Sequence, residues 1–436
     1  MSAAVTSPMP NSPPQRLRVA FLGLLLLLQS VYFGARTLAA LARMDGERAY
    51  FSGDHEVAWQ GYARASRYGG SPEALTLDRA ELLLNGLDMQ NLGVKVSLPM
   101  PPADALEASR AFIGRLVTAS PFRAYYWSLA ADLYLNQAQA GRRGTPLDLS
   151  ALSEDPRENL RPEEVMAVAA LEEAVRREPR NYVYEDILAE QLLQWNLPEL
   201  AIPHVRRGVA LYPVLNSHIH LSRPRLDPAI VDAAVQGFEE ARAAASMIPA
   251  DAIECDAGKF LLGQGKHQEA LAYLERALAI NPTMADALGQ IGIAEYLNGD
   301  YPPAIGHLER ATAVLPDAPY LWFYLGQSRI KAGDRAGARD DLRRARENDP
   351  RNVQLYHAYA EYLETEGALK DAERQFQAAA NTNPTQNMAW RALLAFYGRH
   401  PERRGAVRQV CTRLGSLKSA RDVFEESCLP REEERP

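Results

Sequence analysis

The chain has 436 residues, of which 47% are hydrophobic and 24% charged, so it has ample apolar side chains for a packed interior and is not an intrinsically disordered protein. Its net charge of −7 is modest and no long block of like charge occurs, which argues against a nucleic-acid-binding protein. Only six of the 48 basic residues are lysines, a composition typical of a GC-rich bacterial genome.

The N-terminal region consists of a polar tail followed by an uncharged apolar run. Residues 1–18 are rich in proline and serine, and we expect them to be disordered. Residues 19–35, "VAFLGLLLLLQSVYFGA", carry no charge, and Arg36 can lengthen the segment by snorkelling. The run therefore predicts a transmembrane signal-anchor helix over residues 19–41. A cleaved signal peptide is the alternative, because basic residues precede the run and residues 40–42, A-L-A, resemble a cleavage site.

Helical stretches with irregular spacing follow over residues 37–248. Pro179 and Pro213 are separated by one full period of the regular repeat described below, but the next boundary proline, Pro249, arrives two residues late. The segment between Pro213 and Pro249 contains "NSHIHLSRPRLDP", whose two internal prolines forbid a regular helix. A turn-rich insertion also lies between Gln139 and Pro162. These features predict degenerate repeats with insertions.

Residues 249–414 show a regular period of about 34 residues. The period is marked by Pro282, Pro316, Pro350 and Pro384. A glycine follows the first three of these prolines after seventeen residues, and an alanine follows all four after twenty-two. The sixth position after each proline holds an apolar or aromatic residue: Leu288, Trp322, Tyr356 or Trp390. Each period is therefore predicted to hold two helices, with proline between periods and glycine at the turn within each period.

This pattern resembles the tetratricopeptide repeat (TPR) family, whose W, L-G, Y, A, F, A and P signature is matched by "PYLWFYLGQSRIKAGDRAGARDDLRRARENDP". The resemblance implies an all-α, right-handed helix-turn-helix solenoid of about nine hairpins, preceded here by one transmembrane helix. We expect "GSLKSARDVFEESC", within residues 415–428, to form a capping helix. Residues 429–436 are expected to be a disordered tail.

The same repeat frame extends back to the apolar run. Its small, turn, small, large and small positions are filled by Gly46, Gly53, Ala58, Tyr62 and Ala65. Residues 37–51 then form the first helix of the first repeat, and the transmembrane helix continues directly into it. Signal peptidase cleavage after Ala42 would remove much of that helix, so we favour an uncleaved anchor.

The three cysteines, Cys255, Cys411 and Cys428, lack metal-ligand spacing and are too few for a disulfide framework. Buried or idle thiols are the favoured interpretation. A bridge between Cys411 and Cys428 is the alternative, if the domain lies in an oxidising compartment.

No catalytic motif is found in the sequence, which has no phosphate-binding glycine-rich loop, no H-E-x-x-H and no G-x-S-x-G. His204, His218 and His220 are conceivable metal ligands, but an H-x-H in a proline-rich loop is more typical of a solvated turn. We therefore expect neither an enzyme nor a metal or cofactor site.

In the TPR family the first helix of each repeat lines the concave surface, which implies a partner-binding groove. The outward positions on these helices hold Tyr320, Phe323, Gln327, Lys331, Gln354, His357, Glu361 and Arg391. The lysine and asparagine set with which chaperone-binding relatives clamp a C-terminal carboxylate is not reproduced. The mixed aromatic and polar set instead predicts an extended peptide or helix as partner, and solvated residues without a role are the alternative.

These features predict a non-catalytic scaffold for protein–protein interactions, anchored in the bacterial inner membrane with its repeats in the periplasm. The arginine count does not decide the orientation, because two arginines precede the apolar run closely and three follow it. A membrane helix that runs into such repeats also resembles the C-terminal region of O-antigen ligase and polymerase-type proteins. That resemblance implies, as an alternative, an accessory subunit for envelope polysaccharide synthesis or export.

Overall fold

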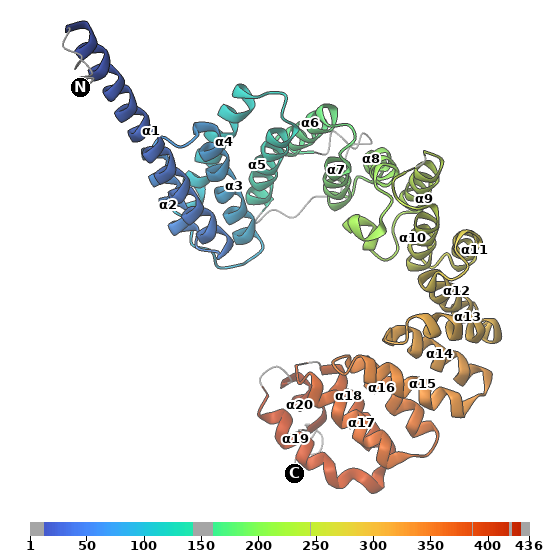
Figure 1. Ribbon diagram of the computed structural model, residues 1–436. Helices are drawn as coiled ribbons and strands as arrows, with labels where there is room; N and C mark the ends of the chain where they lie inside the picture. Colours follow the sequence, from blue (N-terminus) through green and yellow to red (C-terminus); the bar gives the residue numbers. More distant parts are fainter. Residues whose placement is uncertain (1–12, 143–159, 245, 386, 418–420, 429–436) are drawn as a thin grey trace, which may run out of the picture. The chain divides into compact units, whose positions relative to one another are not determined.

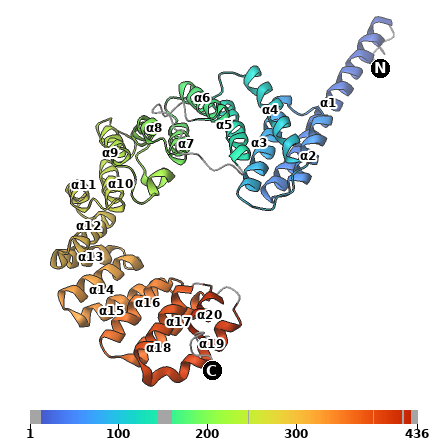
Figure 2. The same cartoon turned by 180° about the vertical axis from the view of Figure 1, so that it is seen from behind.

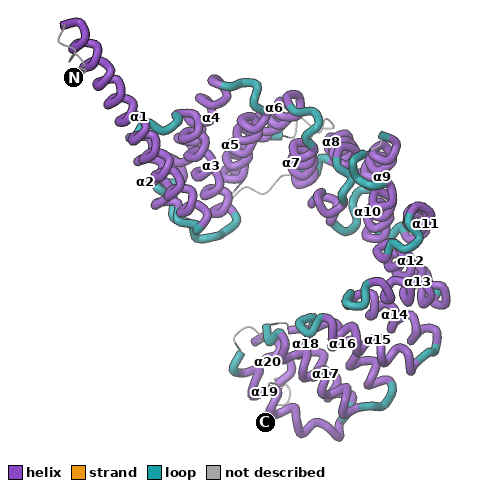
Figure 3. The backbone as a smooth tube through the Cα atoms, in the orientation of Figure 1, coloured by secondary structure: helices purple, strands orange, loops and turns teal. Residues whose placement is uncertain are grey.

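The computed structural model describes residues 13–142, 160–244, 246–385, 387–417 and 421–428. These residues form helices, turns and loops and contain no strand (Figure 3), so the all-α prediction is confirmed for them. The chain divides into two compact parts, which we call the N-terminal unit (Met1–Leu211) and the C-terminal unit (Tyr212–Pro436).

The N-terminal unit is built from successive helical hairpins (Figure 1). Its helices are α1 (Pro13–Phe51), α2 (His55–Arg67), α3 (Pro72–Asn91), α4 (Pro102–Ala119), α5 (Ala124–Arg142), α6 (Pro162–Arg177), α7 (Tyr182–Gln194) and α8 (Pro198–Leu211). Each odd-numbered helix packs most extensively against the even-numbered helix that follows it. The odd-numbered helices are thus the first helices of four hairpins.

The C-terminal unit begins irregularly and then repeats the hairpin. Its elements are η3 (Leu215–Ser217), η4 (Ile219–Ser222), α9 (Pro228–Ala243), α10 (Ala250–Gly263), α11 (His267–Ile280), α12 (Ala285–Asn298), α13 (Tyr301–Val314), α14 (Pro319–Ala332), α15 (Arg335–Asn348), α16 (Val353–Thr365), α17 (Leu369–Thr382), α18 (Asn387–Arg399), η5 (Pro401–Ala406), α19 (Val407–Gly415) and α20 (Arg421–Cys428). Two short 3-10 helices, η3 and η4, stand where a regular first helix would precede α9, as the prolines of that segment predict.

A recurring hydrogen bond accounts for the spacing between the boundary proline and the aromatic residue six positions later. The indole Nε1 of Trp322 donates to the carbonyl oxygen of Pro316 at 2.6 Å. Equivalent bonds join Trp127 to Pro121 (3.0 Å), Trp390 to Pro384 (3.0 Å) and Tyr356 to Pro350 (3.3 Å). The proline ends the preceding segment and its carbonyl lies outside the helical ladder, so the aromatic donor satisfies that carbonyl and anchors the next helix.

The glycines predicted at the turns within repeats adopt the left-handed conformation. Gly299, Gly333 and Gly367 have φ angles of 90°, 86° and 75°. Gly53 has a φ of 82° at the turn between α1 and α2. Glycine is favoured at these positions because it has no Cβ to oppose a positive φ.

The first hairpin is packed through small residues. Ala58 and Ala65 of α2 are fully buried, and Tyr62 is nearly so. Tyr62 lies against Gly46 of α1, since a Cβ added to Gly46 would be 2.8 Å from the tyrosine ring. The residues that the repeat frame selects near the N-terminus therefore all contribute to the contact or the turn of this hairpin.

The N-terminal end of α1 differs from expectation. Residues 13–18, which the sequence assigns to a disordered tail, belong to α1, because the prolines at positions 13 and 14 are tolerated in the first turn of a helix. The sequence also predicts a transmembrane helix over residues 19–41. Among the helices of the described residues, none is long and apolar enough to cross a membrane.

Three further expectations fall wholly or partly outside the described residues. They concern residues 1–12 of the N-terminal tail, residues 143–159 of the insertion, and the tail over residues 429–436. The predicted capping helix is described only in part, as α20.

The C-terminal end of the chain corrects the interpretation of the cysteines as idle thiols. Cys411 of α19 and Cys428 of α20 form a disulfide, with their Cα atoms 5.6 Å apart. The two cysteines meet because α20 packs against α19. Val423 of α20 is fully buried in the hydrophobic cluster at this end of the unit. Cys255 is a free, buried thiol, as the idle-thiol interpretation predicts for it.

Candidate functional site

The eight predicted partner-binding residues lie on the first helices of successive hairpins in the C-terminal unit. Tyr320, Phe323, Gln327 and Lys331 are on α14, Gln354, His357 and Glu361 on α16, and Arg391 on α18. These helices follow one another along the unit in both views (Figures 1 and 2). The eight residues therefore share the first-helix position of successive hairpins, and their gathering on one binding face stays a prediction.

The exposure of these side chains differs. Lys331, Gln354, Glu361 and Arg391 are exposed. Tyr320 is 38% exposed, and burial raises the pKa of its hydroxyl, with the Asp286 carboxylate as the next cause. The neutral phenol is thus held with part of its ring in solvent, an arrangement suited to packing against a partner.

Two of the eight residues, which the repeat frame assigns to outward positions, also take part in packing within the unit. The Phe323 ring lies 5.2 Å from that of Tyr324 and packs against two buried clusters of the C-terminal unit. The His357 ring lies 5.6 Å from that of Phe376, and its Nε2 is 3.2 Å from a carboxylate oxygen of Glu361. Substituting either residue would therefore disturb the fold as well as the surface.

The sequence prediction missed several residues of the first helices, two of which, Lys259 and Asp286, interact electrostatically with Tyr320. Lys259 of α10 forms ion pairs with Asp286 at 3.1 Å and with Asp256 at 3.5 Å. Met388 at the start of α18 is 51% exposed. Asp286, one period before Tyr320, and Met388, one period after Gln354, occupy the same place in the repeat as those two residues. The repeat frame could have identified both.

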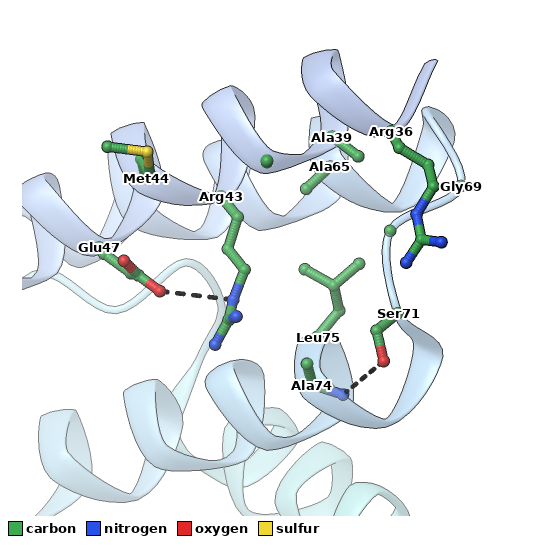
Figure 4. A pocket seen from close by; sticks show the side chains of 12 residues that line it. Arg36, Ala39, Arg43, Met44, Glu47, Ala65, Gly69, Ser71, Ala74 and Leu75 are labelled. Atoms are coloured by element: carbon green, nitrogen blue, oxygen red, sulfur yellow. Dashed lines mark hydrogen bonds and ion pairs between the residues drawn. The ribbon is translucent and has the colours of Figure 1, made fainter. Parts of the chain in front are cut away.

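A cavity of about 380 Å³ lies in the N-terminal unit between α1 and the start of α3 (Figure 4). Arg36 and Arg43 line it, but the Arg43 guanidinium is already engaged within the unit. Its Nε and Nη2 donate to the two carboxylate oxygens of Asp78 at 2.6 and 2.8 Å, and Glu47 lies 3.4 Å away. The hydrogen bond with Asp78 is the main cause that raises the pKa of Arg43. We assign this cavity no ligand, because two neighbouring carboxylates neutralise Arg43.

The histidines considered as metal ligands do not lie in a solvated turn, so that interpretation is wrong. His218 and His220 are each only 1% exposed, because η3 and η4 fold against α10. The Nε2 of His218 lies 2.7 Å from the carbonyl oxygen of Tyr212. His204 belongs to α8, where its Nδ1 is 2.7 Å from a carboxylate oxygen of Glu185.

Comparison with known families supports the assignment of the regular hairpins. Two tetratricopeptide repeat models match the sequence, one over residues 261–323 and the other over residues 323–387. Residues 261–387 match the tetratricopeptide repeat family. The matched TPR segment includes every predicted partner-binding residue except Arg391. Stacked hairpins of this kind form the extended concave surfaces with which repeat proteins bind their partners.

Three solved structures with a similar helical fold each cover less than half of the chain. YrrB, described as a TPR protein with an unusual peptide-binding site, is 20% identical over 44% of this chain and 100% of its own, with a TM-score of 0.35. A MamA structure is 18% identical over 39% of this chain and 96% of its own, with a TM-score of 0.33. MamA from Desulfovibrio magneticus RS-1 is 15% identical over 47% of this chain and 96% of its own, with a TM-score of 0.31. No curated protein sequence matches the chain.

Proposed function

We propose that this protein is a non-catalytic TPR scaffold of the bacterial cell envelope, which holds an extended peptide or a helix of a partner protein on the face formed by α14, α16 and α18. The observation that carries the proposal is the set of exposed and half-exposed side chains on these three first helices, beyond those that the hairpins need for packing.

The chemistry of this face favours a partner segment with both apolar and polar contacts. Tyr320 and Met388 offer partly exposed apolar surface, which can bury an apolar side chain of the partner. Gln354 and Glu361 lie between them along the unit and can bond to a peptide backbone or to basic groups. Peptide recognition sites typically have a small number of aromatic or sulfur-containing anchor residues surrounded by polar side chains.

Membrane attachment is the second part of the proposal, and it rests on the sequence. Residues 19–35 contain no charged residue, and Val31 and Phe33 at the end of this run are 63% and 65% exposed on α1. Exposed apolar side chains of this kind favour burial in a lipid phase or against another protein. The disulfide between Cys411 and Cys428 supports an oxidising compartment such as the periplasm for the repeats.

Site-specific photocrosslinking in membranes tests the binding face. A photoreactive amino acid replaces Gln354 on α16, and the matched control carries it at Arg374, which is exposed on α17, the second helix of the same hairpin. We expect a discrete adduct from position 354 and none from position 374. Tyr320→Ala combined with Met388→Ala should reduce the adduct at least tenfold while the circular dichroism stays unchanged. Equal adducts from both positions, or an undiminished adduct in the double variant, would refute the face.

A second experiment tests the location. An alkaline phosphatase fused to the C-terminus of the full chain should be active, and the fusion should remain in the membrane fraction after carbonate washing. An inactive fusion or release by carbonate would contradict the envelope proposal. Capture of a multi-span polymerase or glycosyltransferase as the partner would favour the polysaccharide-accessory role.

A further inference from the structure

A second cavity of the N-terminal unit, of about 410 Å³, lies among α4, α5 and α6. We call it the α5 cavity, because α5 contacts both of the other helices. Its volume is within the range of small-molecule binding sites, and such sites are lined mainly by apolar and aromatic side chains. The proposed binding face, which belongs to the C-terminal unit, does not include it.

The interior of the α5 cavity is apolar. Ile113 of α4 and Leu133 of α5 are almost fully buried at its lining, as is Ala170 of α6. Met166 of α6 also lines it and is 47% exposed, so apolar surface remains open to an incoming molecule. Burial of that surface by an alkyl chain would be favourable.

Trp127 forms a fixed wall of the α5 cavity. Its indole Nε1 donates to the carbonyl oxygen of Pro121 at 3.0 Å. The Arg177 guanidinium lies 4.8 Å from the ring centroid and donates from Nε to the same carbonyl at 2.5 Å. The ring is therefore held from two sides, and its polar atom is already bonded to the protein.

The charged groups of the lining leave an excess of positive charge. Arg110 of α4 and Arg176 and Glu173 of α6 line the cavity. Glu173 forms ion pairs with both Arg176 and Arg177. Arg110 is exposed, and no carboxylate of the described residues forms an ion pair with it. A ligand with one carboxylate would complement this charge.

The polar groups of the lining also distinguish between kinds of ligand. Apart from the charged residues, the polar side-chain groups of the lining are the Tyr134 hydroxyl and the Trp127 N–H. The Trp127 N–H already donates to the carbonyl oxygen of Pro121. A peptide inserted here would leave most of its backbone N–H and C=O groups without partners, which is costly. An alkyl chain makes no such demand, since its only polar group is the carboxylate at its end.

We propose that the α5 cavity binds a free fatty carboxylate of medium chain length, with the alkyl chain against Ile113, Leu133 and Met166 and the carboxylate at Arg110. This inference does not depend on the proposed function of the C-terminal unit. It adds a small-molecule site to a chain whose repeats otherwise indicate protein partners.

Isothermal titration calorimetry of the full chain with decanoate tests the inference. Each added methylene that becomes buried should raise the affinity roughly fourfold, so decanoate, with two more methylenes, should bind about fifteenfold more tightly than octanoate. Decyltrimethylammonium has a similar chain with the opposite charge and should bind at least tenfold more weakly than decanoate. Equal binding of the two decyl compounds would overturn the inference.

A cavity-filling variant locates the site. Gly114 of α4 lines the α5 cavity, and a Cβ added to it meets nothing within 4 Å. Gly114→Leu should therefore fold normally, fill part of the cavity and weaken decanoate binding at least tenfold. The control is Gly306→Leu on α13, where an added Cβ also meets nothing within 4 Å, and its affinity should stay within twofold. Undiminished binding by Gly114→Leu would exclude this cavity.

A charge variant then tests the carboxylate contact. Arg110→Gln should weaken decanoate binding at least threefold and leave binding of 1-decanol unchanged, because the alcohol carries no charge. The control is Arg67→Gln, which removes an exposed arginine from α2 and should change neither affinity. Equal losses for decanoate and decanol would show that Arg110 does not hold the carboxylate.

One more comparison separates this inference from the proposed function. Tyr320→Ala with Met388→Ala should leave decanoate binding unchanged, whereas it should reduce the photocrosslinked adduct. Gly114→Leu should have the opposite effects. Failure of either idea can thus be recognised without the other.

Discussion

Gly61 of α2 faces Gly46 of α1 so closely that a Cβ added to Gly61 would lie 2.6 Å from the Cα of Gly46. The two glycines bring the backbones of the first hairpin together at the point where the segment after the apolar run enters the repeats. A contact of this kind tolerates no larger side chain on Gly61 unless the helices separate.

Gly61→Ala should therefore destabilise the N-terminal unit by about 1 to 3 kcal/mol, because the added methyl group meets backbone atoms that cannot move aside. The control is Gly114→Ala on α4, where nothing lies within 4 Å of the added Cβ. Alanine at that helical position should stabilise by about 0.5 to 1 kcal/mol. Urea denaturation followed by circular dichroism measures both. If the two variants have the same midpoint, the close contact does not exist in solution.

Substitution of Arg43 should lower the free energy of unfolding, because Arg43 is the ion-pair partner of the buried Asp78 carboxylate. Asp78 is nearly buried and Arg43 is 40% exposed, so Arg43→Met leaves a poorly solvated carboxylate at a cost of about 2 kcal/mol after allowance for screening. Arg43→Met combined with Asp78→Asn removes the charge and should recover most of that loss. A double variant that is no more stable than Arg43→Met would show that packing of the arginine stem, rather than its charge, supports α1.

Asp132 of α5 should make the N-terminal unit less stable as the pH rises. Burial, with the nearby Asp88 carboxylate as the second cause, raises the pKa of Asp132 to about 7. An unfolded aspartate titrates near 3.9, so the folded state holds more protons between these two values. Stability should therefore fall as the pH rises from about 4 to about 7 and then level off. Asp132→Asn should melt several degrees above the parent at pH 8 and close to it at pH 4.

The matched control for Asp132→Asn is Glu56→Gln, which removes a carboxylate from the exposed surface of α2. Its melting temperature should follow that of the parent at both pH values. An Asp132→Asn variant that melts below the parent at pH 8 would show that ionised Asp132 contributes favourably to the fold.

The thiols should respond to maleimide in a fixed order. Cys255 is fully buried and its pKa is raised to about 12, mainly by burial, so no label should enter the native, oxidised protein. Denaturation without reductant should expose one thiol, and denaturation with reductant should expose three, which mass spectrometry can count. Labelling of three thiols without reductant would show that Cys411 and Cys428 are not joined.

Reduction should also loosen the C-terminal end. The disulfide joins residues with a sequence separation of 17, for which chain entropy predicts a stabilisation of about 3 kcal/mol. Cys411→Ser should therefore increase hydrogen exchange in α19 and α20 while leaving α14 and α15 protected. Cys255→Ser is the control for loss of a thiol outside the bridge, and equal exchange in the two variants would contradict the role of the bridge.

The sequence identifies the repeat because its signals are local and periodic. A boundary proline, an aromatic residue six positions later and a glycine at the turn each have a short-range cause, such as the bond from Trp390 to Pro384 or the positive φ of Gly333. Periodicity then assigns the outward positions on α14 and α16 without any knowledge of contacts.

Features that depend on long-range pairing were not predictable in the same way. The pairing of Cys411 with Cys428 could be named only as an alternative, because it requires α20 to turn back on α19 and nothing in the local sequence reports that turn. The burial of His218 and His220 follows from the packing of η3 and η4 on α10. The packing of Phe323 likewise depends on neighbours in other helices, which the repeat frame alone does not reveal.

The bond between a boundary proline and an aromatic side chain gives the molecule its own optical reporters. The five tryptophans, at positions 59, 127, 195, 322 and 390, fall in five different hairpins. Three of them, including Trp127, hold their indole N–H on a proline carbonyl and so sense the junction at which one hairpin meets the next. In an array that unfolds hairpin by hairpin, single-tryptophan versions would change their emission at different points of a denaturation curve and so reveal the order in which the array opens.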